Sequence, residues 1–262
     1  MLGAIIGDII GSPYEYGARK TKSFPLFTYG CRPTDDSVLT VAVGCACAEA
    51  NIKDEYSFKR VLREKLREIG RRYLDAGYGR MFYEWMLSDT DKPYGGLTNG
   101  SAMRVSPTAW AAGSLEEAER LAKWSAEITH DHPEGVKGAV AVASAIYLAR
   151  EGKSKEEIRG YIESKYYDLS FTIEEIRPAY SHDMTCEGSV PQAIAAFLDS
   201  NGFEDAIRNA ISLGGDGDTQ ACIAGAIAEA FYGIPEEISQ RALEYIDEEL
   251  LDLYFGYSDA LY

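Results

Sequence analysis

The sequence lacks any hydrophobic run long enough to cross a membrane. A spanning helix needs about 20 consecutive, mostly apolar residues, and no stretch of the 262-residue chain reaches that length. The segment from Met1 to Asp8 is apolar, but it is short, carries no basic residue and reaches an acidic one early, so we do not expect it to be a targeting segment. We therefore expect a cytoplasmic protein with no membrane partner.

Positive charge is also scarce. The chain has 26 lysines and arginines against 42 acidic residues, a formal net charge of −16. Proteins that bind nucleic acid non-specifically usually present a basic patch or stripe, so we expect no nucleic-acid partner. A ligand with several negative charges would need a metal ion, backbone amides or helix N-termini to hold it.

Cysteine and histidine are few, with five and three residues in the chain. An odd number of cysteines without a targeting segment indicates reduced thiols. Their positions show no zinc-binding pattern, because Cys45 and Cys47 stand two apart in a helical stretch and point to different faces. Zinc and a disulfide framework are therefore not expected.

Helical patterns dominate what is present. Capping-box spacings occur at Ser114, Ser154 and Thr172, each with a glutamate three residues later. Convincing alternating strands, repeats and linkers are absent. The sequence therefore predicts an all-α fold, one compact multi-helix domain over residues 1–262, and a monomer. Helices are expected at residues 1–12, 38–51, 57–76, 133–150, 190–199, 203–213, 219–232 and 235–252.

The first expected helix has glycines four residues apart. Gly3, Gly7 and Gly11 would lie on one face and permit close packing against another helix. Asp8 lies on the same helix, and we expect it to act as a structural cap or as a partner of metal ligands rather than as a ligand itself.

Two acidic segments each precede a helix rich in small residues. The first is Thr34-Asp35-Asp36-Ser37, and the second is Gly214-Gly215-Asp216-Gly217-Asp218-Thr219. If the two helices pack together, four carboxylates and two hydroxyls converge, and their like charges repel unless cations neutralise them. Neither segment contains histidine, so the donors are all oxygen, which favours two Mg²⁺ or Mn²⁺ ions over zinc.

Five motifs in order along the chain carry a family resemblance. They are Gly7-Asp8-Ile9-Ile10-Gly11-Ser12-Pro13-Tyr14-Glu15, Thr34-Asp35-Asp36-Ser37, Asn99-Gly100-Ser101-Ala102-Met103-Arg104, Thr129-His130, and Gly214-Gly215-Asp216-Gly217-Asp218-Thr219. Each alone is weak, but the ordered set resembles the ADP-ribosylglycohydrolase family, the relatives of dinitrogenase-reductase-activating glycohydrolase. The resemblance implies an all-α fold and a site for two Mg²⁺ or Mn²⁺ ions.

The resemblance also implies roles for single residues. It suggests that Glu15 takes part in catalysis and gates the metal site. It places Asn99, Gly100, Ser101 and Met103 along bound ADP-ribose, and His130 near the diphosphate. The implied metal ligands are Thr34, Asp35, Asp36, Asp216, Asp218 and Thr219.

Two positions depart from the family pattern. Thr98 stands where the family often has glycine, and Gly217 stands where a larger residue is common. Neither change removes a ligand, but both alter the pocket that selects the substrate. Arg104 is expected to hold its loop by pairing with an acidic residue.

The implied reaction is hydrolysis of a glycosidic bond at the ribose of an ADP-ribosyl group. Such cleavage needs a leaving-group acid and an activated water, and Glu15, Asp35 or Asp36 fits the acid/base role. The expected substrate is an ADP-ribosylated protein side chain or small adduct, from which ADP-ribose is released. Hydrolysis of a free derivative such as O-acetyl-ADP-ribose and a non-catalytic ADP-ribose-binding or structural role are the alternatives.

Overall fold

The structure is a computed structural model that describes residues 1–17 and 19–261. Tyr262, the last residue of the domain predicted over residues 1–262, lies outside the described part. Within it there are fourteen α-helices and two short 3-10 helices and no strand; the one β-bridge pairs Thr98 with Thr185. The predicted all-α class is confirmed.

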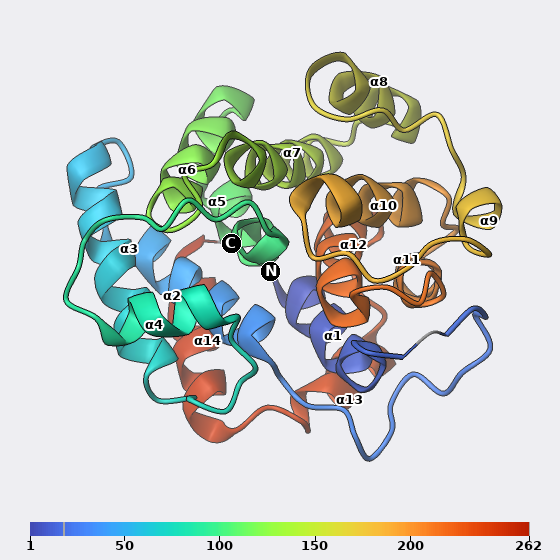
Figure 1. Cartoon of the computed structure of the whole chain (residues 1–262), viewed down its shortest axis with the longest axis horizontal. Helices are drawn as coiled ribbons and strands as arrows, with labels where there is room; N and C mark the ends of the chain where they lie inside the picture. The colour runs from blue at the N-terminus through green and yellow to red at the C-terminus, as the bar shows by residue number, and fades with distance from the viewer. Residues whose placement is uncertain (18, 262) are drawn as a thin grey trace.

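The helices follow one another with short connections along most of the chain (Figure 1). The first half contains α1 (Leu2–Gly11), η1 (Ser12–Tyr14), α2 (Asp35–Glu49), α3 (Glu55–Gly70), α4 (Arg80–Leu87), η2 (Asn99–Ser101), α5 (Ser106–Ala111) and α6 (Leu115–Glu127). The second half contains α7 (Pro133–Arg150), α8 (Lys155–Lys165), α9 (Ile173–Ile176), α10 (Cys186–Leu198), α11 (Phe203–Ile211), α12 (Gly217–Tyr232), α13 (Glu236–Leu243) and α14 (Glu248–Leu261).

Helices α1 and α12 pack with their backbones almost in contact. A Cβ atom added at Gly7 would overlap the carbonyl group of Ala221, and one added at Gly11 would lie 2.5 Å from Asp218 Cα. Gly225 of α12 has the same relation to the backbone of Gly3. The glycine face expected from the sequence is therefore the contact between these two central helices.

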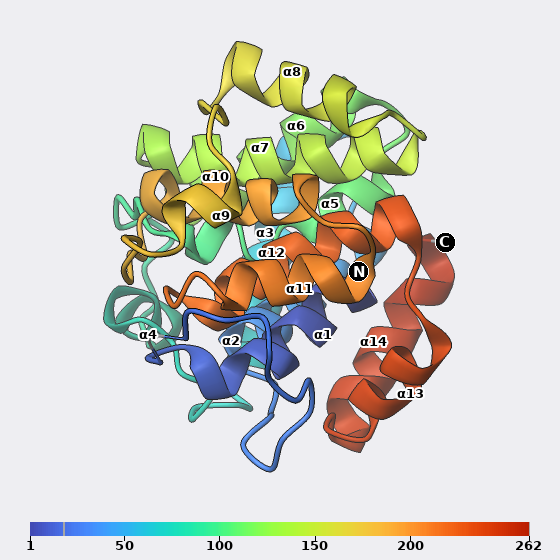
Figure 2. The same ribbon diagram turned by 90° about the vertical axis from the view of Figure 1, so that its right-hand side faces the viewer.

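The other helices surround this pair in layers. Figure 2 shows α8, α7, α10, α12 and α1 stacked from top to bottom, and each helix packs against the next. Helix α2 packs beside α1, and its outer side is covered by α14, where the Tyr257 ring lies against Gly44. This arrangement brings the N-terminal ends of α2 and α12 to the flank of α1.

Local sequence signals explain several helix ends. Ser154 and Thr172 form complete capping boxes with Glu157 and Glu175, as their spacing predicted. Gly214 has a φ of +63°, a left-handed conformation that favours glycine, at the turn that leads into α12. All five cysteines are free and buried, and no helix of the described chain is long and apolar enough to span a membrane.

The single helix predicted over residues 235–252 is wrong. The chain forms α13 and α14 instead, separated at Glu244–Asp247. The Asp247 carboxylate accepts hydrogen bonds from the Leu250 amide at 3.0 Å and from the Tyr73 hydroxyl at 2.9 Å. Asp247 therefore caps a new helix, and a side-chain contact with a distant segment favours the break.

We predict that Gly7→Ala destabilises the protein by about 3 kcal/mol, because the added methyl group meets rigid backbone on α12. Gly160→Ala is the matched control, since this exposed glycine of α8 has no atom within 4 Å of an added Cβ. That variant should gain up to about 1 kcal/mol from helix propensity. Equal denaturant midpoints for the two variants would contradict the close packing of α1 and α12.

Candidate metal and catalytic site

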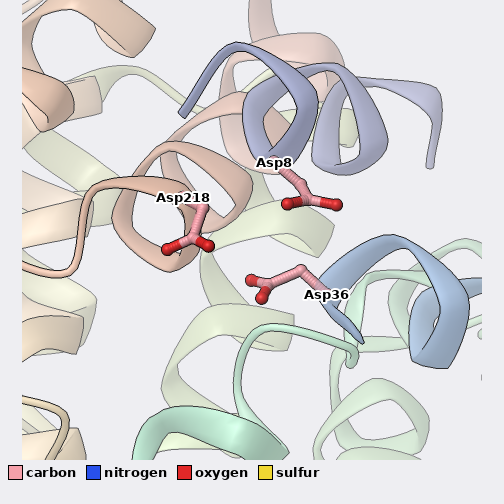
Figure 3. Close-up of side chains that lie close together, drawn as sticks. All are labelled: Asp8, Asp36 and Asp218. Atoms are coloured by element: carbon pink, nitrogen blue, oxygen red, sulfur yellow. The ribbon is translucent and has the colours of Figure 1, made fainter. Parts of the chain in front are cut away.

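Three buried carboxylates from three helices face one another. Asp8 comes from α1, Asp36 from α2 and Asp218 from α12, and one oxygen of each lies within 4.8 Å of the others. Figure 3 shows the three side chains directed toward the same space. Helices α1, α2 and α12 therefore meet at a cluster of Asp8, Asp36 and Asp218, which we call the acidic centre.

Asp8 joins α1 to the start of α2. Its carboxylate accepts hydrogen bonds from the Thr34 amide at 2.8 Å and the Thr34 hydroxyl at 2.6 Å. It also accepts from the Ser37 amide at 3.1 Å and from the Ser37 hydroxyl. The two carboxylate oxygens of Asp8 thus accept hydrogen bonds from four donors at the start of α2. Asp8 therefore caps this helix, which agrees with the structural role expected for it.

The start of α2 provides the second side of the site. Thr34 is the N-cap residue, and its Oγ1 lies 3.4 Å from both the amide nitrogen and Oδ2 of Asp36. Asp36 is buried, and its Oδ1 has no hydrogen-bond partner among the described residues. Asp35 is half-buried, so its side chain lies closer to solvent than that of Asp36.

The start of α12 provides the third side. Asp216, Asp218 and Thr219 are buried there, within the first turn or immediately before it. Thr219 lies near enough to Asp36 to lower the pKa of that carboxyl, so the start of α12 adjoins the start of α2. Asp216 Oδ2 accepts a hydrogen bond from Asn99 Nδ2 at 2.6 Å. One carboxylate from each acidic segment, Asp36 and Asp218, thus lies in the same cluster.

Burial and mutual repulsion raise the pKa values of these acids. Burial is the main cause for each group. The pKa of Asp8 rises to about 6, and that of Asp35, which also faces Asp8 and Glu15, rises to about 8. The pKa values of Asp36 and Asp218 lie well above the usual range, since each is also repelled by neighbouring carboxylates.

This donor set suits hard divalent cations. Every donor is a carboxylate or hydroxyl oxygen, the preference of Mg²⁺ and Mn²⁺. The unpartnered Asp36 Oδ1 is a buried acceptor that a cation would satisfy. Bound cations would also offset the repulsion that raises the pKa values. The residues present therefore fit a metal centre.

Glu15 lies at the edge of the acidic centre. It follows η1 and is half-buried, and its charge contributes to the raised pKa values of Asp35 and Asp218. A hydrogen bond with Glu15 raises the pKa of the neighbouring Tyr16 to about 12. Glu15 thus stands near the cluster and remains accessible from outside.

The segment predicted to bind substrate has a buried side and a half-buried side. Ser101 is fully buried and donates to Gly135 O at 2.7 Å, and Met103 is buried as well. Gly100 is half-buried, while Asn99 is buried and directed to Asp216. A ligand that approaches from solvent would therefore contact the backbone near Asn99 and Gly100, and not the side chains of Ser101 and Met103.

His130 and Arg104 lie beneath this segment. His130 is buried, and burial and the charge of Arg104 hold its pKa well below the usual value. The expectation that Arg104 pairs with an acid is wrong within the described residues. Its Nη2 donates instead to Thr129 Oγ1 at 2.7 Å and to Ser125 O at 3.3 Å.

Sequence reasoning singled out Asp8 and Thr98 but did not predict where either side chain lies in the site. Asp8 lies within the acidic cluster itself, a position that its glycine-rich helix only partly indicated. Thr98 contacts His130 across 32 residues of sequence, and only its departure from the family glycine drew attention to it. No spacing along the chain predicts such a contact between distant loops.

A comparison with protein-family models assigns this architecture to a class. The ADP-ribosylglycohydrolase model matches residues 1–260. The chain belongs to the ADP-ribosylglycohydrolase family, as the ordered motifs had indicated.

Curated proteins and solved structures agree with this assignment. The chain is 26% identical to the ADP-ribosylhydrolase ARH3 of Bos taurus over 328 residues, covering 96% of this chain and 89% of the relative. It is 29% identical to the ADP-ribosylarginine hydrolase Tri1 of Pseudomonas putida over 284 residues, covering 96% and 76%. A solved chain titled "ADP-ribosylglycohydrolase-related protein complex" has the same fold, with a TM-score of 0.68 at 21% identity and coverage of 100% and 97%.

We predict that the metal-free protein loses stability as pH rises. The folded-state pKa of Asp35, about 8, lies above its ordinary value of 3.8, so between these pH values the folded chain holds protons that the unfolded chain has released. The thermal midpoint in chelator should fall from pH 5 to pH 8. Saturating Mn²⁺ at pH 8 should raise it by about 5 °C or more.

Asp36→Asn is the control for this measurement. The substitution removes a buried carboxyl group whose own pKa is raised well above the usual value, with little change of shape, so the decline with pH should shrink and the Mn²⁺ effect should fall. An equal decline in the variant and the wild type would show that the acidic centre does not cause it.

Proposed function

We propose that the protein is a metal-dependent hydrolase that cleaves the N- or O-glycosidic bond of ADP-ribosylated side chains or small adducts and releases ADP-ribose. The observation that carries this proposal is the convergence of Asp8, Asp36 and Asp218 from three helices in a member of this family. The names of the ARH3 and Tri1 relatives, both hydrolases of ADP-ribosyl compounds, support the substrate class.

Two Mg²⁺ or Mn²⁺ ions fit the donors around this centre. The proposed ligands are Thr34, Asp35, Asp36, Asp216, Asp218 and Thr219. When bound, the ions would bind the vicinal hydroxyls of the ribose and polarise a water beside its anomeric carbon.

The proton transfers of the reaction require side chains that a substrate can reach. Glycoside cleavage needs a carboxyl group that donates a proton to the leaving atom and a group that removes one from water. Asp36 is buried within the cluster, whereas Glu15 and Asp35 are half-buried. We therefore assign the proton transfers to Glu15 and Asp35, and a holding role to Asp36.

The substrate is expected to lie along the segment that begins at Asn99. The Asn99 side-chain amide donates a hydrogen bond to Asp216, and this bond connects the segment to the acidic centre. Gly100 presents backbone beside it, and Ser101 and Met103 hold the segment from the buried side. His130 packs against the buried side of this segment.

Two other functions share this site. Hydrolysis of O-acetyl-ADP-ribose would use the same ribose-binding geometry on an ester bond. A non-catalytic ADP-ribose-binding role would tolerate loss of acidic ligands, yet all of the predicted ligands are retained in the sequence. The complete ligand set therefore favours an enzyme.

The deciding assay measures release of free ADP-ribose from a panel, with Mg²⁺ or Mn²⁺ and with chelator. The panel holds arginine-linked and serine-linked ADP-ribosyl peptides and O-acetyl-ADP-ribose. We expect metal-dependent release from at least one glycosidic substrate. Absence of release from every substrate, with ADP-ribose binding intact, would favour a binding protein.

We predict that Asp218→Ala abolishes turnover and weakens Mn²⁺ binding. The substitution removes a buried carboxylate, one of the proposed metal ligands, from the start of α12. Turnover and calorimetric Mn²⁺ titration would be measured on the same preparation. Full activity of the variant at an ordinary metal concentration would refute the proposed ligand set.

We predict a different pattern for Glu15→Gln. The variant should lose roughly 100-fold in kcat, the usual contribution of a general acid or base, while it keeps its affinity for Mn²⁺. Asp36→Asn should lose both properties. If Glu15→Gln instead loses metal binding and keeps kcat in excess metal, Glu15 is a ligand and the proton-transfer assignment is wrong.

A further inference from the structure

A groove with a volume of about 430 Å³ lies between α4 and the segment that follows it. Helix α4 packs against α3 (Figure 1). The side chains that line the groove, which we call the α4 groove, include Met81, Glu84, Trp85, Lys92 and Tyr94. None of these five residues belongs to the proposed metal ligands or to the proposed proton-transfer groups.

Two arginines at the end of α3 hold both walls of the groove. Arg71 Nε donates to Met86 O of α4 at 2.9 Å, and Arg67 Nη2 donates to Thr90 O of the following segment. The Arg67 guanidinium also lies 4.6 Å from the centre of the Trp85 ring. Because both walls are fastened to the same helix, the groove is formed before a ligand arrives, as binding sites usually are.

The groove combines apolar surface with donors that lack partners. The Met81 side chain is half exposed, at 52%, and the indole Nε1 of buried Trp85 has no hydrogen-bond partner within the described chain. Glu84 is paired with Arg80 at 2.9 Å, whereas Lys92 has no ion pair among residues 1–17 and 19–261. An apolar side chain with a carboxylate beside it complements this surface, since a carboxylate only accepts.

Both ends of the groove adjoin the proposed active site. Asp35 N donates to Ala76 O at 3.0 Å, and α4 begins four residues after Ala76. At the other end, Tyr94 N donates to Thr129 O at 3.2 Å, and the Tyr94 ring lies 5.3 Å from the His130 ring. A substrate held at the acidic centre therefore has the groove beside it.

The length of the groove suits a short stretch of polypeptide. Helix α4 has eight residues and is therefore about 12 Å long. An extended peptide spans that length with about four residues. A chain whose modified residue enters the acidic centre can thus place its neighbouring residues along α4.

We propose that the α4 groove binds the polypeptide that carries the ADP-ribosylated residue, and that it selects a flanking sequence with an apolar side chain and a carboxylate. The inference rests on the proposed function and adds a docking surface to it. Met81 contacts the apolar side chain, and Lys92 pairs with the carboxylate. Neither residue takes part in the cleavage itself.

The test compares kcat/KM for release of ADP-ribose at fixed Mg²⁺ from three substrates with the linkage that the panel identifies. These are the free ADP-ribosylated amino acid, a peptide with leucine and glutamate flanks, and a peptide with leucine and lysine flanks. The flanks lie three to five positions away on both sides. Wild type should prefer the glutamate-flanked peptide to the free amino acid by roughly 10-fold, from apolar burial and one exposed ion pair.

Two variants separate the charge from the apolar contact. Lys92→Glu should reverse the preference between the two peptides, by about threefold in each direction. Met81→Ser should weaken both peptides by roughly 5-fold, because half of a methionine side chain is no longer buried against them. Both variants should cleave the free amino acid as wild type does.

Lys53→Glu is the matched control for the charge reversal. Lys53 is an exposed lysine before α3 that has no ion pair within the described chain and does not line the groove. Its substitution changes the net charge equally and should leave the flank preference unchanged. Thermal melts would verify that each variant is folded.

Three outcomes would overturn the inference and leave the proposed function intact. They are equal kcat/KM of wild type for the peptides and the free amino acid, an unchanged flank preference in Lys92→Glu, and a wild-type dimer that Met81→Ser dissociates. The last would assign the groove to a second copy of this chain. A wild type that cleaves none of the substrates with Mg²⁺ or Mn²⁺ would overturn the proposed function, and this inference with it.

Discussion

Repulsion among buried carboxylates is the constraint on which the site depends. Asp8, Asp36 and Asp218 have oxygens within 4.8 Å of one another, although burial disfavours even one charge. Burial raises the pKa values of all three, and repulsion by neighbouring carboxylates raises those of Asp36 and Asp218 further. Apart from protonation of the acids, such an arrangement is maintained when a larger packing energy holds the helices together or when cations neutralise the centre. The fold supplies the first, and we infer that divalent ions supply the second.

The packing energy comes from the contact between α1 and α12. Gly7 and Gly11 allow the two backbones to meet, which fixes Asp8 beside the first turn of α12. Asp8 then caps α2 through Thr34 and Ser37, so the third helix is positioned by the first. A single helix therefore aligns both acidic segments. Asn99 extends this alignment to the substrate-facing segment through its hydrogen bond to Asp216.

Patterns local in sequence predicted much of this structure. The capping signals and the glycine face of α1 correctly indicated helices and their contact, and the family model confirmed the resemblance carried by the ordered motifs. Features that depend on distant contacts were beyond such reasoning. The break before α14 depends on Asp247 and its bond to Tyr73, and the contact of Thr98 with His130 joins separate loops. Arg104 was expected to pair with an acid, and only the packed structure reveals its hydroxyl and carbonyl partners.

The central claim is that the acidic centre is a site for two divalent cations. The most direct measurement is anomalous X-ray scattering from crystals grown with Mn²⁺. The account predicts two manganese peaks between the start of α2 and the start of α12, in contact with Asp36 and Asp218. Manganese bound only elsewhere, or an acidic centre without any peak at saturating Mn²⁺, would contradict it.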